Sequence, residues 1–375
     1  MIRAFRLSLL TLLLAPAVGA TQPAVNKWRL VEDLRIGGAD EGPKSFTEIR
    51  GIVTTRAGTI FILDFKELEL RVFDSKGTFL RVAARKGRGP GEILFPNGLS
   101  IGGDDVVVVS DPGNGRFSFY APDGRFIRQV AIPITGYGDY WHGVMDQQGR
   151  VVDLPVRVAA GGVNPKTGWP ETTDHIRRIR SDGKADTVQF PRCAPDAPLL
   201  VYRLPGGRST STPVPYSPDE KTVVTRMGTV WCTPSGDYRL FAGPIGGPVK
   251  EVVHKTVTPI PVSDADRRNA IDGLARFTGS MGGKLISGDP SAIPRTRSVI
   301  TQLFADDQGR AWVRRTGVTD VTTAFDVFDA TGRAVAEIRS PAGVGQVVFT
   351  TGDILITVLT NADNVPVVVR YRIER

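Results

Sequence analysis

Gly42-Pro43 opens a stretch of sequence that recurs, without a gap, from Gly89-Pro90 onward. Every matched pair of residues in the two copies lies 47 positions apart (89 − 42 for the first glycine). The further pairs are Gly51 and Gly98, Asp64 and Asp111, Phe73 and Tyr120, Gly77 and Gly124, Phe79 and Phe126, and Arg81 and Arg128. A period of this size, built from β-type residues, is typical of a propeller blade, in which each repeat forms one four-stranded sheet. The sequence therefore predicts a β-propeller.

The first copy indicates the strands of one blade. Residues 51–55 alternate as an inner strand, and the apolar run of residues 60–64 predicts a strand that is covered on both faces. Residues 70–73 are expected to form the third strand. Asp74-Ser75-Lys76-Gly77 then makes the hairpin turn before an outer strand over residues 78–82.

Later copies match the first two less well, but their turns can still be recognised. We expect blade three at about residues 143–190, blade four at about 213–254 and blade five at about 299–339, with a sixth beginning near Gly345. The sixth blade lacks an outer strand, and the alternating segment of residues 28–36 is expected to supply it and close the ring. The predicted fold is an all-β, six-bladed β-propeller closed by an N-terminal outer strand, with five or seven blades as the alternatives.

Residues 255–298 do not fit the repeat and are interpreted as a helical insert between blades four and five. Ser263 is a plausible N-cap, and Asp264 and Asp266 suit the first turn of a helix. Ile271, Leu274 and Phe277 would then fall on one helix face. Long inserts in compact folds are often lids or partner sites, and a helix that only packs on the propeller is the other interpretation.

The first 20 residues have the pattern of a signal peptide. Arg3 and Arg6 precede the apolar run of residues 7–14, and small residues at Val18 and Ala20 predict cleavage after Ala20. The apolar run is too short to span a bilayer, and no other segment is long and apolar enough to do so. We therefore expect an exported protein, periplasmic or extracellular, whose residues 21–375 form the propeller.

The charge and the cysteine content limit the classes of partner and the compartment that we expect. The formal charge of +8 falls to +6 without Arg3 and Arg6, and no basic run is interleaved with aromatic residues, so nucleic acid is not an expected partner. The two cysteines, Cys193 and Cys232, suit one disulfide in an oxidising compartment, with two free buried thiols as the alternative. We expect a monomer.

The run from Gly87 to Leu99, Gly-Arg-Gly-Pro-Gly-Glu-Ile-Leu-Phe-Pro-Asn-Gly-Leu, resembles the NHL-repeat propellers, in which such a loop opens each blade. Phe-Asp-x-x-Gly, which turns the last hairpin in that family, stands here at Phe73 to Gly77 and again at Phe328 to Gly332. The whole chain is similar to exported bacterial six-bladed members of that superfamily. The resemblance implies a scaffold for recognition, and function does not follow from the fold.

Candidate ligand-binding residues are expected at the mouth of the central channel, where each inner strand starts. Aligning the blades on their glycine turns gives the set Glu48, Arg50, Asn97, His142, Tyr216, Gln302 and Gln346. The resemblance extends to propeller lactonases and related hydrolases, which hold a calcium ion there, and Glu48 and Asn97 could serve it with His142 as an acid or base. Arg50 would repel a cation, so a hydrogen-bonding channel for a polar ligand, without metal or other cofactor, fits better. Solvated rim residues with no ligand are the remaining interpretation.

Two functions from different classes are left. The first is a non-catalytic exported propeller that binds a protein, peptide or glycan. The second is a calcium-dependent lactonase, hydrolase or lyase that acts at the channel mouth. The sequence has no H-E-x-x-H and no G-x-S-x-G motif, and we favour the first function.

Overall fold

Two adjacent blades reproduce the strands expected from the 47-residue repeat. A computed structural model describes residues 25–39, 41–131, 140–163, 170–315, 323–340, 343–345 and 348–375. Blade one consists of β2 (Ile49–Thr54), β3 (Ile60–Asp64), β4 (Glu69–Phe73) and β5 (Phe79–Ala84). Blade two consists of β6 (Gly98–Ile101), β7 (Val107–Asp111), β8 (Arg116–Tyr120) and β9 (Phe126–Ala131). All residues of β3 and β7 are buried, as a strand covered on both faces requires.

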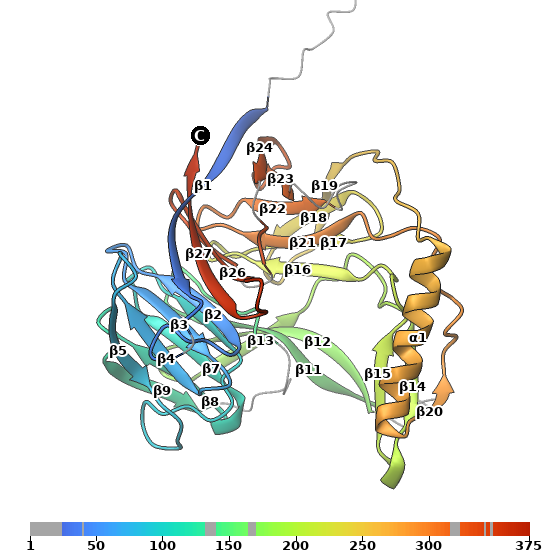
Figure 1. Cartoon of the computed structure of the whole chain (residues 1–375), viewed down its shortest axis with the longest axis horizontal. Coiled ribbons are helices and arrows are strands. Elements are labelled where there is room, and N and C mark those ends of the chain that lie inside the picture. Colours follow the sequence, from blue (N-terminus) through green and yellow to red (C-terminus); the bar gives the residue numbers. More distant parts are fainter. Residues whose placement is uncertain are drawn as a thin grey trace, which may run out of the picture.

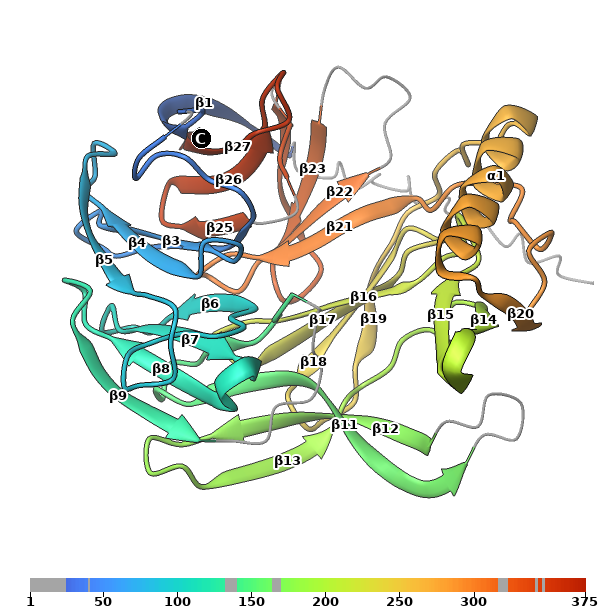
Figure 2. The ribbon, with the colours of Figure 1, turned by 60° about the horizontal axis from the view of Figure 1, so that its bottom comes forward.

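Four further blades complete the propeller, so the prediction of six is confirmed (Figures 1 and 2). Blade three comprises β10 (Val144–Met145), β11 (Val151–Val163), β12 (Pro170–Ile179) and β13 (Ala185–Gln189). Blade four comprises β16 (Glu220–Val224), β17 (Thr229–Pro234), β18 (Arg239–Pro244) and β19 (Lys250–His254). Blade five comprises β21 (Ile300–Ala305), β22 (Ala311–Arg315), β23 (Thr323–Phe328) and β24 (Ala334–Ser340). Blade six comprises β25 (Val348–Thr351), β26 (Ile354–Thr360), β27 (Pro366–Glu374) and β1 (Asn26–Gly37).

Strand β1 closes the ring as predicted. It pairs antiparallel with β27 and, through Asn26 to Arg29, parallel with β24 of blade five, so that blades five and six form one continuous sheet. Trp28 and Leu30 are buried in a cluster that includes Trp312 and Phe325. The alternation in the sequence predicted the burial, whereas the second pairing with β24 was not predicted.

The Asp-x-x-Gly runs form the expected hairpin turns. The Asp74 carboxylate accepts hydrogen bonds from the backbone N–H groups of Thr78 and Lys76 at 2.8 and 2.9 Å, and Gly77 has a φ of 76°. Asp329 makes the same two bonds to Thr331 and Arg333 at 3.0 and 3.1 Å. This side-chain bonding, with a glycine at the left-handed position, is why these residue types mark the turns.

The insert is larger than predicted, because it has a second part in front of blade four. Helix α1 (Asp264–Met281) begins with a capping box in which Ser263 and Asp266 bond reciprocally, as the sequence suggested. Strand β20 (Lys284–Ser287) pairs with β14 (Leu199–Arg203), which pairs with β15 (Ser209–Pro213). We call α1, β14, β15 and β20 the accessory module. It lies at one side of the ring in both views (Figures 1 and 2).

The accessory module has its own small apolar core, formed by Leu200, Tyr202, Val214, Val262 and Ile293. On the helix, Leu274 packs against this core, whereas Ile271 and Phe277 each remain 44% exposed. Two short 3-10 turns, at Pro112–Asn114 and Pro205–Gly207, complete the secondary structure of the described residues. None of the helices found in them has the length and apolar character needed to cross a membrane.

Candidate functional site at the channel mouth

The inner strands of the blades surround a cavity of about 670 Å³. Strands β6, β16 and β21 converge toward it from different sides of the ring (Figure 2). Residues of all six blades line the cavity, and Leu154, Asp174 and Phe190 extend it between blades three and four. This volume is in the range of small-molecule and side-chain binding pockets. The channel centre is therefore the candidate functional site.

One arginine organises the rim beside blade four. The guanidinium of Arg192 lies 2.6 Å from Asp196, 3.2 Å from Glu220 and 3.7 Å from Asp174. Burial alone would lower the pKa of Arg192, but the hydrogen bond to Asp196 and the charges of Glu220 and Asp196 outweigh it and raise that pKa. We call Arg192, Asp174, Asp196 and Glu220 the rim cluster.

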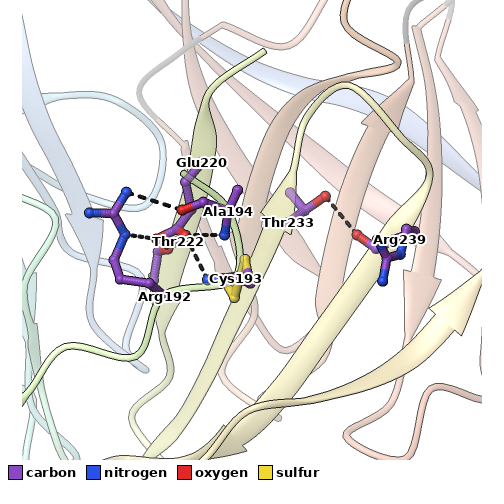
Figure 3. The surroundings of a disulfide bond; sticks show 8 residues. Arg192, Cys193, Ala194, Glu220, Thr222, Thr233 and Arg239 are labelled. Atoms are coloured by element: carbon purple, nitrogen blue, oxygen red, sulfur yellow. Dashed lines mark hydrogen bonds and ion pairs between the residues drawn. A yellow bond between two sulfur atoms is a disulfide. The ribbon is translucent and has the colours of Figure 1, made fainter. Parts of the chain in front are cut away.

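Glu220, the first residue of the inner strand of blade four, uses both carboxylate oxygens (Figure 3). One oxygen accepts the backbone N–H groups of Cys193 and Ala194 at 2.7 and 2.8 Å. The other accepts the Thr222 hydroxyl at 3.2 Å and faces Arg192. The carboxylate thereby fixes the backbone of the segment that carries Arg192.

The same segment is held by a disulfide between Cys193 and Cys232 of β17, with a Cα–Cα distance of 6.2 Å (Figure 3). Cys232 is fully buried. The bridge ties the chain between blades three and four to the middle strands of blade four. It thus places Arg192 at the rim of the cavity.

Of the residues predicted for the channel mouth, the structure brings two to the cavity. His142, before the inner strand of blade three, and Gln302, on β21 of blade five, both line it. Gln302 is 7% exposed and donates from Nε2 to the Gly345 carbonyl at 3.0 Å. Gln346 lies outside the described residues.

Three other predicted residues belong to the blades but do not line the cavity. Glu48 pairs with Arg50 at 2.7 Å and with Lys66 at 3.7 Å. The Arg50 guanidinium lies 3.3 Å from the centroid of the Phe65 ring. Asn97 is buried, and its backbone N–H donates to the Ser110 carbonyl at 2.9 Å.

The placement of Tyr216 in the mouth of blade four was wrong. Tyr216 lies instead in a shallow groove of the accessory module, with Leu274 and Phe277 of α1. Blade four starts at Glu220, not near residue 213, because Ser209–Pro213 is drawn into the accessory sheet by its pairing with β14. Glu220 and Thr222 therefore take the lining positions that were expected of Tyr216.

The residues proposed for calcium do not form a cation site. Among the residues that the structure describes, no three His, Cys, Asp or Glu side chains come together in a way that could hold a metal ion. Glu48, the expected carboxylate ligand, faces two basic groups.

Sequence reasoning missed the rim cluster. Its members come from three different segments, and only the position of Arg192 next to Cys193 gave a local signal. The position of Arg192 at the cavity depends on how the disulfide-linked segment folds around blade four. No spacing in the sequence predicts that position.

Comparisons with known proteins support the fold. Residues 44–139 match a protein family described as 6-bladed beta-propeller, which fits the predicted propeller class. A member of the DUF4221 family from Bacteroides vulgatus is 11% identical, with a TM-score of 0.50 over 94% of this chain and 100% of that one. Virginiamycin B lyase from Staphylococcus aureus is 12% identical, with a TM-score of 0.46 over 92% of this chain and 99% of that one.

A curated protein is also similar over part of this chain. Protein brain tumor of Drosophila melanogaster is 22% identical over 157 residues, which are 40% of this chain and 15% of that protein. The chain thus matches only a small part of the length of this relative. These similarities concern the propeller, and none assigns an activity to the chain.

Proposed function

We propose that this chain is an exported, non-catalytic propeller that binds part of a protein, peptide or glycan in its central channel. The observation that carries the proposal is the cavity of about 670 Å³ with polar groups from several blades at its rim. A pocket that combines apolar walls with a few fixed polar groups is typical of a binding site.

The bonding of the rim cluster favours binding over catalysis. Glu220 spends both oxygens on backbone and side-chain donors, and Arg192 contacts three carboxylates. A general acid or base needs a proton that it can exchange with a substrate within hydrogen-bond reach. Groups that are fully engaged with one another instead form a rigid, charged surface.

Export is supported by the signal-peptide pattern of residues 1–20 and by the disulfide. Disulfides persist in oxidising compartments and are rare in the cytosol. Fractionation of producing cells, with sequencing of the N-terminus of the recovered protein, tests this part. A product that starts at Thr21 outside the cytoplasm is expected, and a cytoplasmic product that retains Met1 would overturn it.

Binding is tested by thermal melts of the purified protein with three sets of probes: casein peptides, chitin and cellulose oligosaccharides, and simple lactones. We expect peptides or oligosaccharides to raise the melting temperature of the wild type and to have less effect on Gln302→Leu. The matched control is Gln129→Leu, on the exposed outer strand of blade two. Turnover of a lactone that requires Glu48 and calcium would replace this proposal with the enzyme alternative.

A further inference from the structure

We propose that the channel receives a protonated amine or guanidinium, the group carried by lysine and arginine side chains. This inference rests on the proposed function and names the chemistry of its ligand. Three features of the cavity support it: its charge, its unpartnered acceptors and its apolar wall.

The cavity is acidic in a basic protein. Its lining contains six carboxylates and three basic side chains, which leaves a formal charge of −3 with His142 neutral. The whole chain carries +8. The carboxylates are Asp174, Asp196, Asp219, Glu220, Asp306 and Asp307, and the basic residues are Arg192, Lys221 and Arg226. An excess of one sign of charge in a cleft favours ligands of the opposite sign.

Three side chains of the lining carry oxygen atoms that have no hydrogen-bond partner among the described residues. They are Oε1 of Gln302 on β21, Oγ1 of Thr350 on β25 and Oδ1 of Asp307, which follows β21. Gln302 and Thr350 are 7% and 5% exposed. Since Nε2 of Gln302 is held by the Gly345 carbonyl, the unsatisfied atom of this amide is its oxygen. Buried polar atoms in folded proteins are nearly always hydrogen-bonded to protein or to ordered water, so these three can bond to a water or to a ligand.

Asp307 is the strongest of these acceptors. Its Oδ2 accepts the Thr351 hydroxyl and the Gly352 backbone N–H, each at 2.9 Å. It makes no ion pair with any residue that the structure describes. By contrast, the neighbouring Asp306 is paired with Arg310 at 2.6 Å. The charge of Asp307 is therefore available to a ligand cation.

The apolar part of the lining suits the stem of such a ligand. Leu99 and Ile101 of blade two, Leu303 and Phe304 of blade five, and Phe349 of blade six all contribute to the wall. Lysine and arginine combine an apolar stem with a charged, donor-only head. A sugar ring lacks such a stem, and an anion would meet the negative formal charge of the lining.

The test is calorimetric titration of the purified protein at low salt with three probes that are all acetylated at the α-amine: the lysine, norleucine and glutamate methylamides. We expect the lysine probe to bind at least tenfold more tightly than norleucine, which has a similar stem without the charge, and glutamate not to bind. Spermidine, titrated separately, distinguishes a free amine from a peptide side chain as the source. The ligand is a free amine if spermidine binds more tightly than the lysine probe.

Two variants locate the site. Asp307→Asn, which keeps an acceptor for Thr351 and Gly352, should weaken lysine-probe binding about fivefold or more. Gln302→Leu, near the other end of β21, should weaken it less. Asp363→Asn, in an exposed turn, and Gln129→Leu are the matched controls and should leave it unchanged.

Equal binding of the lysine and norleucine probes, tighter binding of glutamate, or no effect of Asp307→Asn would overturn the inference. If oligosaccharides or neutral peptides bind and the lysine probe does not, the inference fails while the proposed function stands. If nothing binds and a lactone is turned over, both fail.

Discussion

Blades one and two hold the segment that leads to their inner strand with hydrogen bonds to a buried aspartate and from a buried arginine, whereas blade four uses a disulfide and the rim cluster. The Asp64 carboxylate accepts the backbone N–H groups of Thr47 and Glu48 at 3.0 and 3.2 Å. Its repeat partner Asp111 accepts those of Leu94 and Phe95 at 3.1 and 2.8 Å. Both aspartates are fully buried, so these bonds replace water for otherwise unsatisfied donors.

At the corresponding end of β17, blade four has Ser235 instead. Its hydroxyl donates to the Asp219 carboxylate at 2.7 Å and accepts the Asp219 backbone N–H at 2.9 Å. Here the accessory strands β14 and β15 separate β13 from β16 along the chain, so the connection is long. The short connections are thus fixed by hydrogen bonds alone, whereas the long connection of blade four is also tied by a covalent bond.

The largest effect is expected from removing the covalent bond. The double variant Cys193→Ala/Cys232→Ala opens a loop with a sequence separation of 39 residues. In the chain-entropy model this costs roughly 4 kcal/mol of unfolding free energy. Urea denaturation of the wild type and the variant measures it. Adding reductant should lower the stability of the wild type and leave the variant unchanged; a variant as stable as the wild type would show that the ion pairs alone suffice.

Asp111→Ala breaks the equivalent device in blade two. It leaves two partly buried backbone N–H groups without this acceptor, and we expect a loss of about 2 kcal/mol. Asp123→Ala, in an exposed turn of the same blade, is the control and should lose less than about 1 kcal/mol. Denaturant midpoints with unchanged slope report the difference. Equal losses in both variants would contradict the role assigned to the buried aspartate.

Glu220→Gln weakens the rim cluster of blade four without removing its disulfide. Glutamine keeps the size of the side chain but loses one acceptor and the charge that faces Arg192, and we expect a loss of about 1–2 kcal/mol, since Arg192 is partly exposed. Glu251→Gln, whose partner Arg239 lies on the outer part of the same blade, should change stability by less than about 0.5 kcal/mol. A larger loss in the control would mean that the outer charge pair, and not the rim cluster, holds blade four.

The smallest effect concerns a device that the blades share, the Asp-x-x-Gly turn. The backbone N–H of Thr78, followed by that of Lys76, holds the pKa of Asp74 below its usual value. A lowered folded-state pKa contributes stability that is present above the ordinary pKa, near 3.8, and is lost as the pH falls through the lower value. Melting temperatures measured from pH 6 to pH 2.5 should therefore fall slightly more steeply for the wild type than for Asp74→Asn. Parallel curves would contradict the assignment.

Local rules predicted the parts of the fold that depend on neighbours in sequence. The hairpin aspartates, the Ser263 cap of α1 and the alternation of β1 all follow from short segments. The accessory sheet was missed because β14 meets β20 through pairs such as Val201 and Ser287, which are far apart in the chain and share no repeat. That omission shifted the start of blade four and misplaced Tyr216.

The residues of the candidate site were predicted only where they occupy an inner-strand position that recurs in every blade. His142 and Gln302 were found from the blade alignment, since inner-strand positions recur. Arg192 and Asp196 lie on a connection, and Asp174 lies on β12, so the alignment of inner strands had no place for them. Asp307 was overlooked because it follows the inner strand at its far end, beyond the positions that were aligned.

The double pairing of β1 has a consequence for the order of events during synthesis and folding. This strand needs β24 and β27, and its partners, such as Ala336 for Asn26 and Ile373 for Leu30, are made more than 300 residues later. Contacts of such long range form slowly. Until β27 is synthesised, β1 lacks its antiparallel partner, and the blades can only form an open arc. A chain exported before it folds would meet both partners at once, on the far side of the membrane.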